Sequence, residues 1–289
     1  MKKSSVSNWQ FIDPEGTFRI ENPHQSNYLY FPLVTEAGMK SAITPNLNGD
    51  VKTDQNVFLT PPQSVEDLHT SRAARNFWVY TPDIGAWSVT GNSALQNAHQ
   101  FSEPNTEEVS LEAGFLWHKL IRSSQEVGIC AETINFVPSS TDNVELMKVT
   151  LSNISQSDIS ITPTAAIPIY GRSADNLRDH RHVSSLLHRT HCSEYGVFIK
   201  PTLSFDERGH LPNTVTYAVL GIEDDGSKPI GFIPVLEDCI GEGGTLDWPE
   251  TIVRSLPPTA QAGNSYEGCD SIGGSRFADP VLKPGESKS

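Results

Sequence analysis

The chain has 289 residues, and its 37% of hydrophobic residues suits a soluble globular protein with a core of normal size. Lys and Arg number 21 against 35 Asp and Glu, and the net charge of -14 argues against a nucleic-acid backbone or an anionic membrane surface as the main partner. No run of 18 apolar residues and no signal-peptide pattern occurs, so we expect a cytoplasmic protein without membrane contact.

The segment at residues 18–33 combines polar neutral side chains with aromatic ones. Asn22 and His24 lie between apolar ends, and Tyr28 and Tyr30 follow. Neutral hydrogen-bonding groups beside aromatic rings can hold a sugar, because hydroxyls need donors and acceptors while the CH face of a pyranose packs against a ring. The same pattern is typical of a strand and turn whose side chains bond the local backbone.

The following segments predict two short helices and a β-hairpin. Helical spacing covers residues 64–75 and, for a turn or two, residues 94–101. Between them, the aromatic segments 72–80 and 86–92 flank a turn around Gly85, which predicts two paired strands. We assign the two tryptophans of these strands to the core rather than to stacking on a ligand.

The rest of the chain is predicted to form strands. In residues 144–151 apolar positions alternate with charged and polar ones, and turn-forming residues follow. Similar strands are predicted over residues 115–121, 128–137, 159–169, 196–200, 215–222 and 230–235. Closely spaced strands with 21 Gly and 20 Pro favour a sandwich over a parallel sheet with crossover helices. Residues 256–274, rich in Pro, Gly and Ser, are expected to form a long loop.

A Pro-Gly turn lies close to the last residue. A short apolar run leads into Pro284 and Gly285, and polar residues follow that should open one more strand. Because the sequence stops at this turn, we expect the sandwich to lack its last strand and the chain to be part of a larger protein.

Histidines are concentrated between Asp179 and Cys192, where arginines are interleaved with them. A metal site is disfavoured there, because guanidinium groups repel a cation. A loop, a subunit contact and a site for an anionic or polyhydroxyl ligand remain open. The cysteines are far apart in sequence and are expected to be reduced, metal-free thiols. They are Cys130, Cys192, Cys239 and Cys269.

Three pairs of neighbouring carboxylates stand out as potential acid/base groups. Each lies in polar, turn-like sequence, so we interpret all three as solvated and none as a catalytic pair. They are Asp13 with Glu15, Glu107 with Glu108, and Asp224 with Asp225. No nucleophile elbow, phosphate-binding glycine loop or zinc-peptidase helix is present.

Five segments, in order, carry a resemblance to a known family. They are residues 22–28 (NPHQSNY), 76–80 (NFWVY), 87–91 (WSVTG), 144–153 (VELMKVTLSN) and 282–286 (LKPGE). With them, nearly the whole chain resembles the N-terminal sandwich domain of glycoside phosphorylases of the cellobiose phosphorylase group, glycoside hydrolase family 94. The resemblance implies an all-β fold: a large antiparallel β-supersandwich, galactose-mutarotase-like, with a few short helices, spanning residues 1–289. The catalytic (α/α)6 barrel that follows it in such enzymes is absent from this sequence.

The resemblance also implies a non-catalytic role. The full enzyme would use inorganic phosphate as co-substrate, without a cofactor or metal, to cleave a β-linked glucose disaccharide or oligosaccharide and give a sugar 1-phosphate. The barrel would supply the catalytic acid, whereas this domain would bind carbohydrate, support a homodimer and contribute loops to the rim of the active site. The residues expected at that rim or interface are His24, Tyr28, Arg75, Asn76, Arg178, Asp179, His180 and Arg181.

Two other classes of protein remain as alternatives. The first is a stand-alone carbohydrate-binding protein. The second is an aldose mutarotase-like epimerase, because a supersandwich also resembles these enzymes, in which two histidines and a glutamate open and close a sugar ring. His180, His182 and Glu237 would be its candidate groups.

Overall fold

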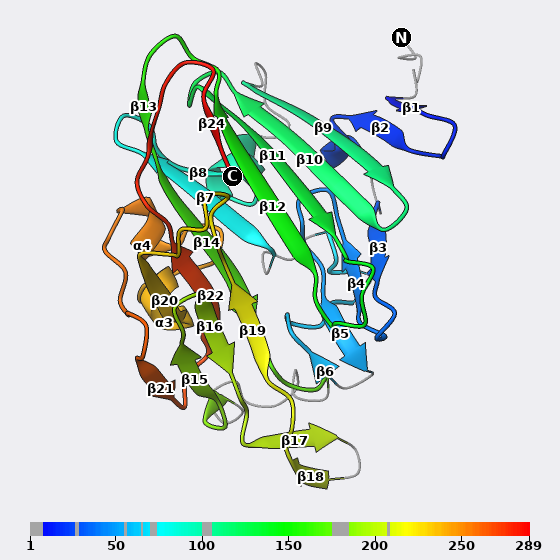
Figure 1. The fold of residues 1–289 in the computed structure, drawn as a ribbon, viewed down its shortest axis with the longest axis vertical. Coiled ribbons are helices and arrows are strands. Elements are labelled where there is room, and N and C mark those ends of the chain that lie inside the picture. The colour runs from blue at the N-terminus through cyan, green and yellow to red at the C-terminus, as the bar shows by residue number, and fades with distance from the viewer. Residues whose placement is uncertain are drawn as a thin grey trace.

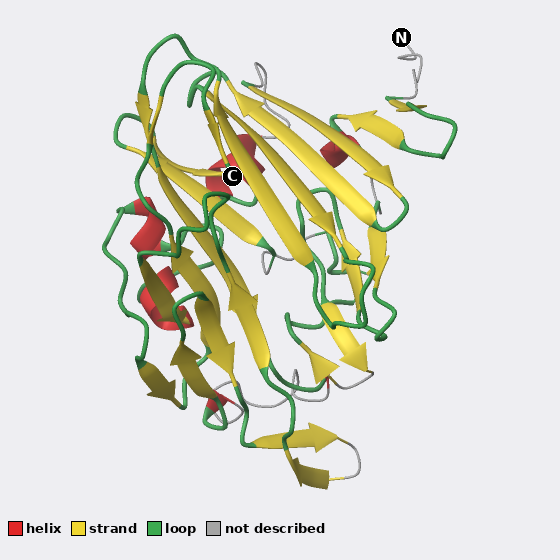
Figure 2. Ribbon diagram, viewed as in Figure 1, coloured by secondary structure: helices red, strands yellow, loops and turns green. Residues whose placement is uncertain are grey.

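The computed structural model describes residues 8–26, 29–54, 57–64, 66–69, 74–99, 106–174, 185–206 and 209–289 (Figure 1). Within these ranges the chain forms antiparallel sheets and only a few short helices (Figure 2), which confirms the predicted all-β sandwich class. None of the helices in the described ranges has the length and apolar character needed to cross a membrane.

The largest sheet has seven strands in the order β1-β2-β9-β10-β11-β12-β24. They are β1 (Trp9–Phe11), β2 (Phe18–Glu21), β9 (Glu107–Gly114), β10 (Trp117–Ser124), β11 (Ile129–Phe136), β12 (Leu146–Asn153) and β24 (Ser287–Lys288). Buried and partly exposed side chains alternate along β10 and β11, as expected for a sheet with one face turned inward. The strand predicted over residues 115–121 begins later, since Phe115 and Leu116 form the turn after β9.

A five-stranded sheet packs against the inner face of the first one, in the order β20-β22-β14-β7-β8. Its strands are β7 (Asn76–Thr81), β8 (Gly85–Ser88), β14 (Thr162–Ile169), β20 (Gly231–Val235) and β22 (Ser271–Arg276). β7 and β8 are paired antiparallel with Val79 opposite Trp87, so the predicted hairpin is confirmed.

The predicted long loop over residues 256–274 is wrong at its C-terminal end, because β22 lies in the interior of the five-stranded sheet. Its glycines are needed for packing. A Cβ on Gly273 would lie 2.3 Å from Cβ of Val219, and one on Gly274 would lie 2.4 Å from the backbone oxygen of Ile233. Glycine is therefore required here by close approach of neighbours within a strand rather than by a turn.

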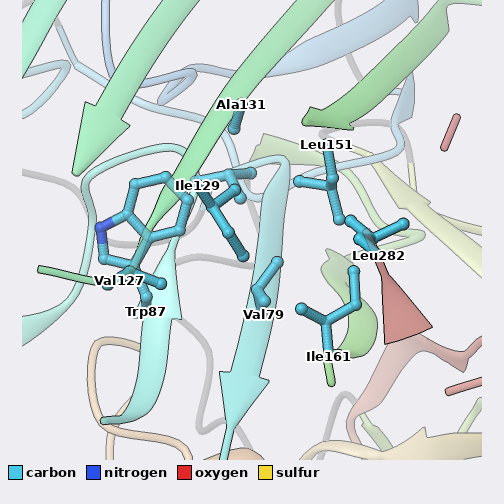
Figure 3. Packing of buried hydrophobic residues seen from close by; sticks show 9 residues of the cluster. Val79, Trp87, Val127, Ile129, Ala131, Leu151, Ile161 and Leu282 are labelled. Atoms are coloured by element: carbon cyan, nitrogen blue, oxygen red, sulfur yellow. The ribbon is translucent and has the colours of Figure 1, made fainter. Parts of the chain in front are cut away.

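The main core lies between the two sheets (Figure 3). Val79 and Trp87 from the five-stranded sheet meet Ile129, Ala131 and Leu151 from the seven-stranded sheet, and all five are at most 5% exposed. Complete burial of a large apolar side chain stabilises a fold by about 1.5–3 kcal/mol. The assignment of the hairpin tryptophans to the core is confirmed, since Trp78 is also buried, on the opposite face of β7.

Smaller sheets and helices extend the sandwich at both ends. The sheet β19-β16-β15-β21 shares a hydrophobic core with the five-stranded sheet. Helices α3 and α4 cover the outer face of the five-stranded sheet. The sheet β3-β4-β5-β6 shares a core with β12. The remaining elements are η1 (Pro23–Gln25), β3 (Phe31–Val34), β4 (Lys40–Ile43), β5 (Val51–Asp54), β6 (Val57–Phe58), α1 (Ala94–His99), β13 (Ile159–Ser160), β15 (Arg189–Cys192), β16 (Gly196–Ile199), β17 (Leu203–Asp206), β18 (Gly209–Pro212), β19 (Tyr217–Leu220), α3 (Leu236–Ile240), α4 (Glu250–Val253), β21 (Ser265–Glu267) and β23 (Val281–Leu282).

Of the two helices predicted in the first third of the chain, one is confirmed. α1 occupies the segment predicted to hold a turn or two. The helix predicted over residues 64–75 is wrong within its described part, because residues 66–69 form turns and Ala74 makes a β-bridge with Asn48. The polar side chains there satisfy local backbone groups: Ser64 Oγ accepts a hydrogen bond from the backbone of Asp67.

The Pro-Gly turn near the last residue is present, but the expectation that a final strand is lacking needs correction. Gly285 adopts a φ of 75°, and Glu286 donates a backbone hydrogen bond to Lys283. The polar residues that follow form β24, which pairs with Leu151 and Ser152 at the edge of the seven-stranded sheet. The short strand therefore already covers part of that edge.

Candidate functional site

A solvent-accessible pocket of about 470 Å³ lies where α1 and η1 meet the ends of β8, β9 and β10. At its centre is an ion pair between Arg122 on β10 and Glu107 on β9. The register opposes Glu107 to Ser124, so Glu107 and Arg122 are diagonal neighbours on the inner face of the sheet. Their side chains are only 14% and 7% exposed, which places both charges away from bulk water.

The carboxylate of Glu107 accepts hydrogen bonds from three different elements. Arg122 Nη1 donates to Oε2, while Oε1 accepts from Trp87 Nε1 at 2.7 Å and from Gln96 Nε2 at 2.8 Å. Arg122 Nη2 in turn donates to Oδ1 of Asn46 at 3.4 Å. A partly buried carboxylate with this many donors is fixed in orientation.

The segment at residues 87–91, one of those that carry the family resemblance, forms a wall of this pocket. Trp87 donates to Glu107, and Gly91 lies against the guanidinium of Arg122. Gly91 has a φ of 80°, and a Cβ at this position would be 2.1 Å from Arg122 Nη2. Only glycine satisfies both the backbone conformation and the close approach.

His24 is the sequence-predicted site residue that lines the pocket. It belongs to η1, whose first residue is Pro23. Burial lowers the pKa of His24, the charge of Arg122 lowers it further, and Glu107 partly opposes both effects. The imidazole is therefore neutral at physiological pH, so it offers one donor and one acceptor.

The pocket is also lined by aliphatic side chains. Ile84 and Leu95 are about half exposed, at 48% and 52%, whereas Val127 is buried. The pocket thus combines amide, imidazole and charged groups with aliphatic side chains. This combination suits a small ligand that has both hydroxyl groups and a CH surface.

Arg75 and Asn76 do not lie at a rim. They are 3% and 0% exposed, and the guanidinium of Arg75 forms a two-pronged ion pair with Glu145, with Nη2 to Oε2 at 2.9 Å. The expected rim role therefore does not fit these two residues. The other predicted rim residues lie outside the described residues: Tyr28, Arg178, Asp179, His180 and Arg181.

His118 lies close to this second ion pair and makes the stability of the fold depend on pH. Burial and the charge of Arg75 lower the pKa of His118 from 6.5 to about 3. The unfolded chain takes up this proton near pH 6.5, whereas the folded chain does not, so stability falls as the pH falls from about 6.5 toward 3. We expect a loss of about 2 kcal/mol between pH 7 and pH 5 from this group alone.

Urea unfolding at the two pH values, in the wild type and in His118→Leu, measures this contribution. The variant should show a smaller drop by about that amount, whereas His191→Leu, at an exposed position on β15, should behave as the wild type. An identical drop in His118→Leu and the wild type would contradict the assignment of the proton uptake to His118.

Sequence reasoning missed the two central charges of the pocket. The interpretation of Glu107 as a solvated turn residue is wrong, because it lies on β9 and forms an ion pair with Arg122. The available signal was Arg122 itself, which shares the buried face of a strand with Leu120 and Ser124. A charged side chain at an inward position requires a partner of opposite charge.

The other chemistry-bearing groups lie elsewhere. Glu237 is exposed on α3 and does not line the pocket. All four cysteines are free thiols, and burial raises the pKa of Cys192 to about 11 and of Cys239 to about 12. Among the described residues, no group of three or more His, Cys, Asp or Glu is arranged to hold a metal ion.

No protein-family model matches the sequence, and a search of curated proteins found no match. The pocket and its side chains are therefore the basis for proposing a function.

Proposed function

We propose that this chain binds carbohydrate in the pocket around Glu107 and Arg122, as the non-catalytic β-supersandwich domain of a glycoside phosphorylase. The observation that carries the proposal is the mixed lining of the pocket. Fixed hydrogen-bonding groups at Glu107, Arg122 and Gln96 line the same pocket as the aliphatic side chains of Ile84 and Leu95. A pyranose has the complementary surface, with hydroxyls at its edge and CH groups on its faces.

The pocket is lined by several uncharged hydrogen-bonding groups. They are the amides of Asn46 and Gln96, the hydroxyl of Ser93 and the imidazole of His24. Hydroxyl groups donate and accept at the same atom, so they match such a mixed set better than a purely anionic or cationic ligand does.

The role of the domain in a phosphorylase follows from the chemistry of the reaction. Inverting phosphorolysis needs one acid to protonate the leaving oxygen and one site that holds phosphate for attack on the anomeric carbon. Glu107 is already engaged by three donors. We therefore expect this chain to bind sugar and to support a homodimer and the active-site rim of a larger enzyme, but to release no sugar 1-phosphate from disaccharide and inorganic phosphate.

A binding measurement tests the proposal. Ligand-observed NMR titration of the chain with methyl β-D-glucopyranoside and cellobiose should show saturable binding. Because one hydrogen bond or small apolar contact contributes about 1 kcal/mol, we expect His24→Ala and Leu95→Ala each to weaken binding about 3–10-fold. His191→Ala, outside the pocket, is the matched control and should bind as the wild type does. Absence of saturable binding to either sugar would reject the proposal.

A second candidate function is aldose mutarotation, favoured by one specific observation. His24 and His99 line the same pocket as Glu107, so two histidines and a glutamate share one site. These differ from the groups expected from sequence, of which His180 and His182 lie outside the described residues. Polarimetry separates the two functions: an epimerase accelerates the mutarotation of α-D-glucose, and the acceleration is lost in His24→Ala, whereas a binding domain leaves the rate unchanged.

A further inference from the structure

We infer that the pocket accepts uncharged sugars and excludes sugar phosphates and inorganic phosphate, and that Glu126 determines this selectivity. The inference rests on the proposed carbohydrate-binding function and names the chemical class of its ligand. It follows from the distribution of charge around the pocket, which differs from the distribution that a phosphate site needs.

Two carboxylates and one guanidinium line the pocket. Glu107 and Glu126 contribute negative charge, Arg122 contributes positive charge, and no lysine is among the described residues that line it. The chain as a whole carries a net charge of -14. An anion that approaches the pocket therefore meets a negative local charge within a negative protein, which lowers both its local concentration and its affinity.

The guanidinium of Arg122 is not available to neutralise a phosphate. Its Nη1 donates to Glu107, its Nη2 donates to Asn46, and its plane lies against the backbone at Gly91. A phosphate would have to displace the carboxylate of Glu107 from a partly buried pair and leave that charge without its partner. Breaking such a pair is strongly unfavourable, whereas an uncharged hydroxyl does not compete with the carboxylate of Glu107 for the guanidinium.

Glu126 adds a negative charge to the lining of the pocket. It is exposed and lies in the turn between β10 and β11. That turn is held in place, because Gly128 donates its backbone hydrogen to the oxygen of Ser124, and Val127 donates to Ser124 Oγ. The side chain of Glu126 can reorient, but the backbone of this residue stays beside the pocket. It repels a phosphate dianion and leaves a neutral sugar unaffected.

Because of this selectivity, the sugar and the phosphate of a phosphorolysis reaction bind at different sites. The pocket can take a β-glucoside or free glucose, whereas phosphate and the sugar 1-phosphate have to be held by another part of the enzyme. Sugar bound here therefore does not compete with phosphate for the same groups, and the pocket can hold carbohydrate while phosphate concentrations vary.

Titration of the full chain with methyl β-D-glucopyranoside, glucose 1-phosphate and inorganic phosphate tests the inference. We expect the neutral glucoside to bind and the two phosphates to bind at least tenfold more weakly. In Glu126→Gln and Glu126→Lys, affinity for glucose 1-phosphate should rise by about fivefold per unit of charge removed, because one close pair of unit charges in water corresponds to about that factor. Affinity for the neutral glucoside should stay within twofold.

Glu108→Lys is the matched control. It makes the same change in net charge on the exposed face of β9, outside the pocket, so it should leave the selectivity unchanged. If neither the glucoside nor glucose 1-phosphate binds, the proposed function itself fails. If glucose 1-phosphate binds as tightly as the glucoside, or if Glu108→Lys and Glu126→Lys raise its affinity equally, the inference is wrong while sugar binding stands.

Discussion

Replacing Glu145 with alanine should lower the free energy of unfolding by about 3–5 kcal/mol, the usual cost of leaving one buried charge without its partner. Glu145 accepts hydrogen bonds from the buried guanidinium of Arg75, from Ser41 Oγ at 2.7 Å and from Asn135 Nδ2 at 3.2 Å. The side chains of the ion pair are only 4% and 9% exposed, so water cannot replace the lost carboxylate. Urea unfolding followed by tryptophan fluorescence measures the change.

The matched control is Glu194→Ala, which removes an ion pair with Lys228 at an exposed position. It should leave the free energy of unfolding close to that of the wild type, because solvent screens surface pairs. Since Glu145→Ala can prevent folding altogether, the double variant Arg75→Met with Glu145→Leu provides a second measurement. Removal of both charges should recover most of the stability. Similar losses in Glu145→Ala and Glu194→Ala would show that the buried pair is solvated in the folded protein.

Replacing Gly91 with alanine should both destabilise the fold and abolish sugar binding. The left-handed backbone conformation costs a residue with a Cβ about 1–2 kcal/mol. The Cβ would also overlap the guanidinium of Arg122, at 2.1 Å from Nη2, and such overpacking costs about 1–3 kcal/mol more. The displaced guanidinium can no longer hold Glu107, so the pocket loses its central pair. Urea unfolding and the glucoside titration report the two effects.

Gly85→Ala isolates the backbone effect. Gly85 also has a positive φ, 94°, but no atom lies within 4 Å of the position that its Cβ would take. We expect it to lose only the backbone contribution of about 1–2 kcal/mol and to keep its sugar affinity. Equal losses of stability in the two variants would show that Arg122 moves aside without cost, and retained sugar binding in Gly91→Ala would remove Arg122 from the site.

The parts of the fold that sequence predicts are those in which local pattern and tertiary environment agree. β11 alternates buried and partly exposed side chains, the β7-β8 hairpin joins two aromatic segments through a turn, and both were predicted. β22 was not predicted, because glycines such as Gly273 and Gly274 are typical of loops. The close neighbours that require glycine at these positions become known only from the structure. Residues 64–75 have apolar residues at helical spacing, but residues 66–69, in their described part, form turns instead of a helix. Contacts distant in sequence decided the first case, and local side-chain hydrogen bonds contributed to the second.

The candidate site was harder to predict from the sequence than the fold. His24 lines the pocket, and the aromatic segment that contains it was recognised for its polar neutral groups. Glu107 and Arg122 become neighbours only through the register of β9 against β10, which opposes Glu107 to Ser124. Sequence spacing alone does not provide that register. Arg75 was expected at the rim or interface because the family resemblance implied such a role, yet its guanidinium is buried in the ion pair with Glu145.

The position of β22 in the five-stranded sheet has a consequence for folding during synthesis. β14 pairs with β7 on one edge and with β22 on the other, and β22 begins only at Ser271. A ribosome adds about 5–20 residues per second, so the roughly one hundred residues between the two strands take on the order of 5–20 s to appear. Throughout that time β14 exposes a row of unpaired backbone groups to other nascent chains. The emergence of β22 therefore completes the pairing of β14.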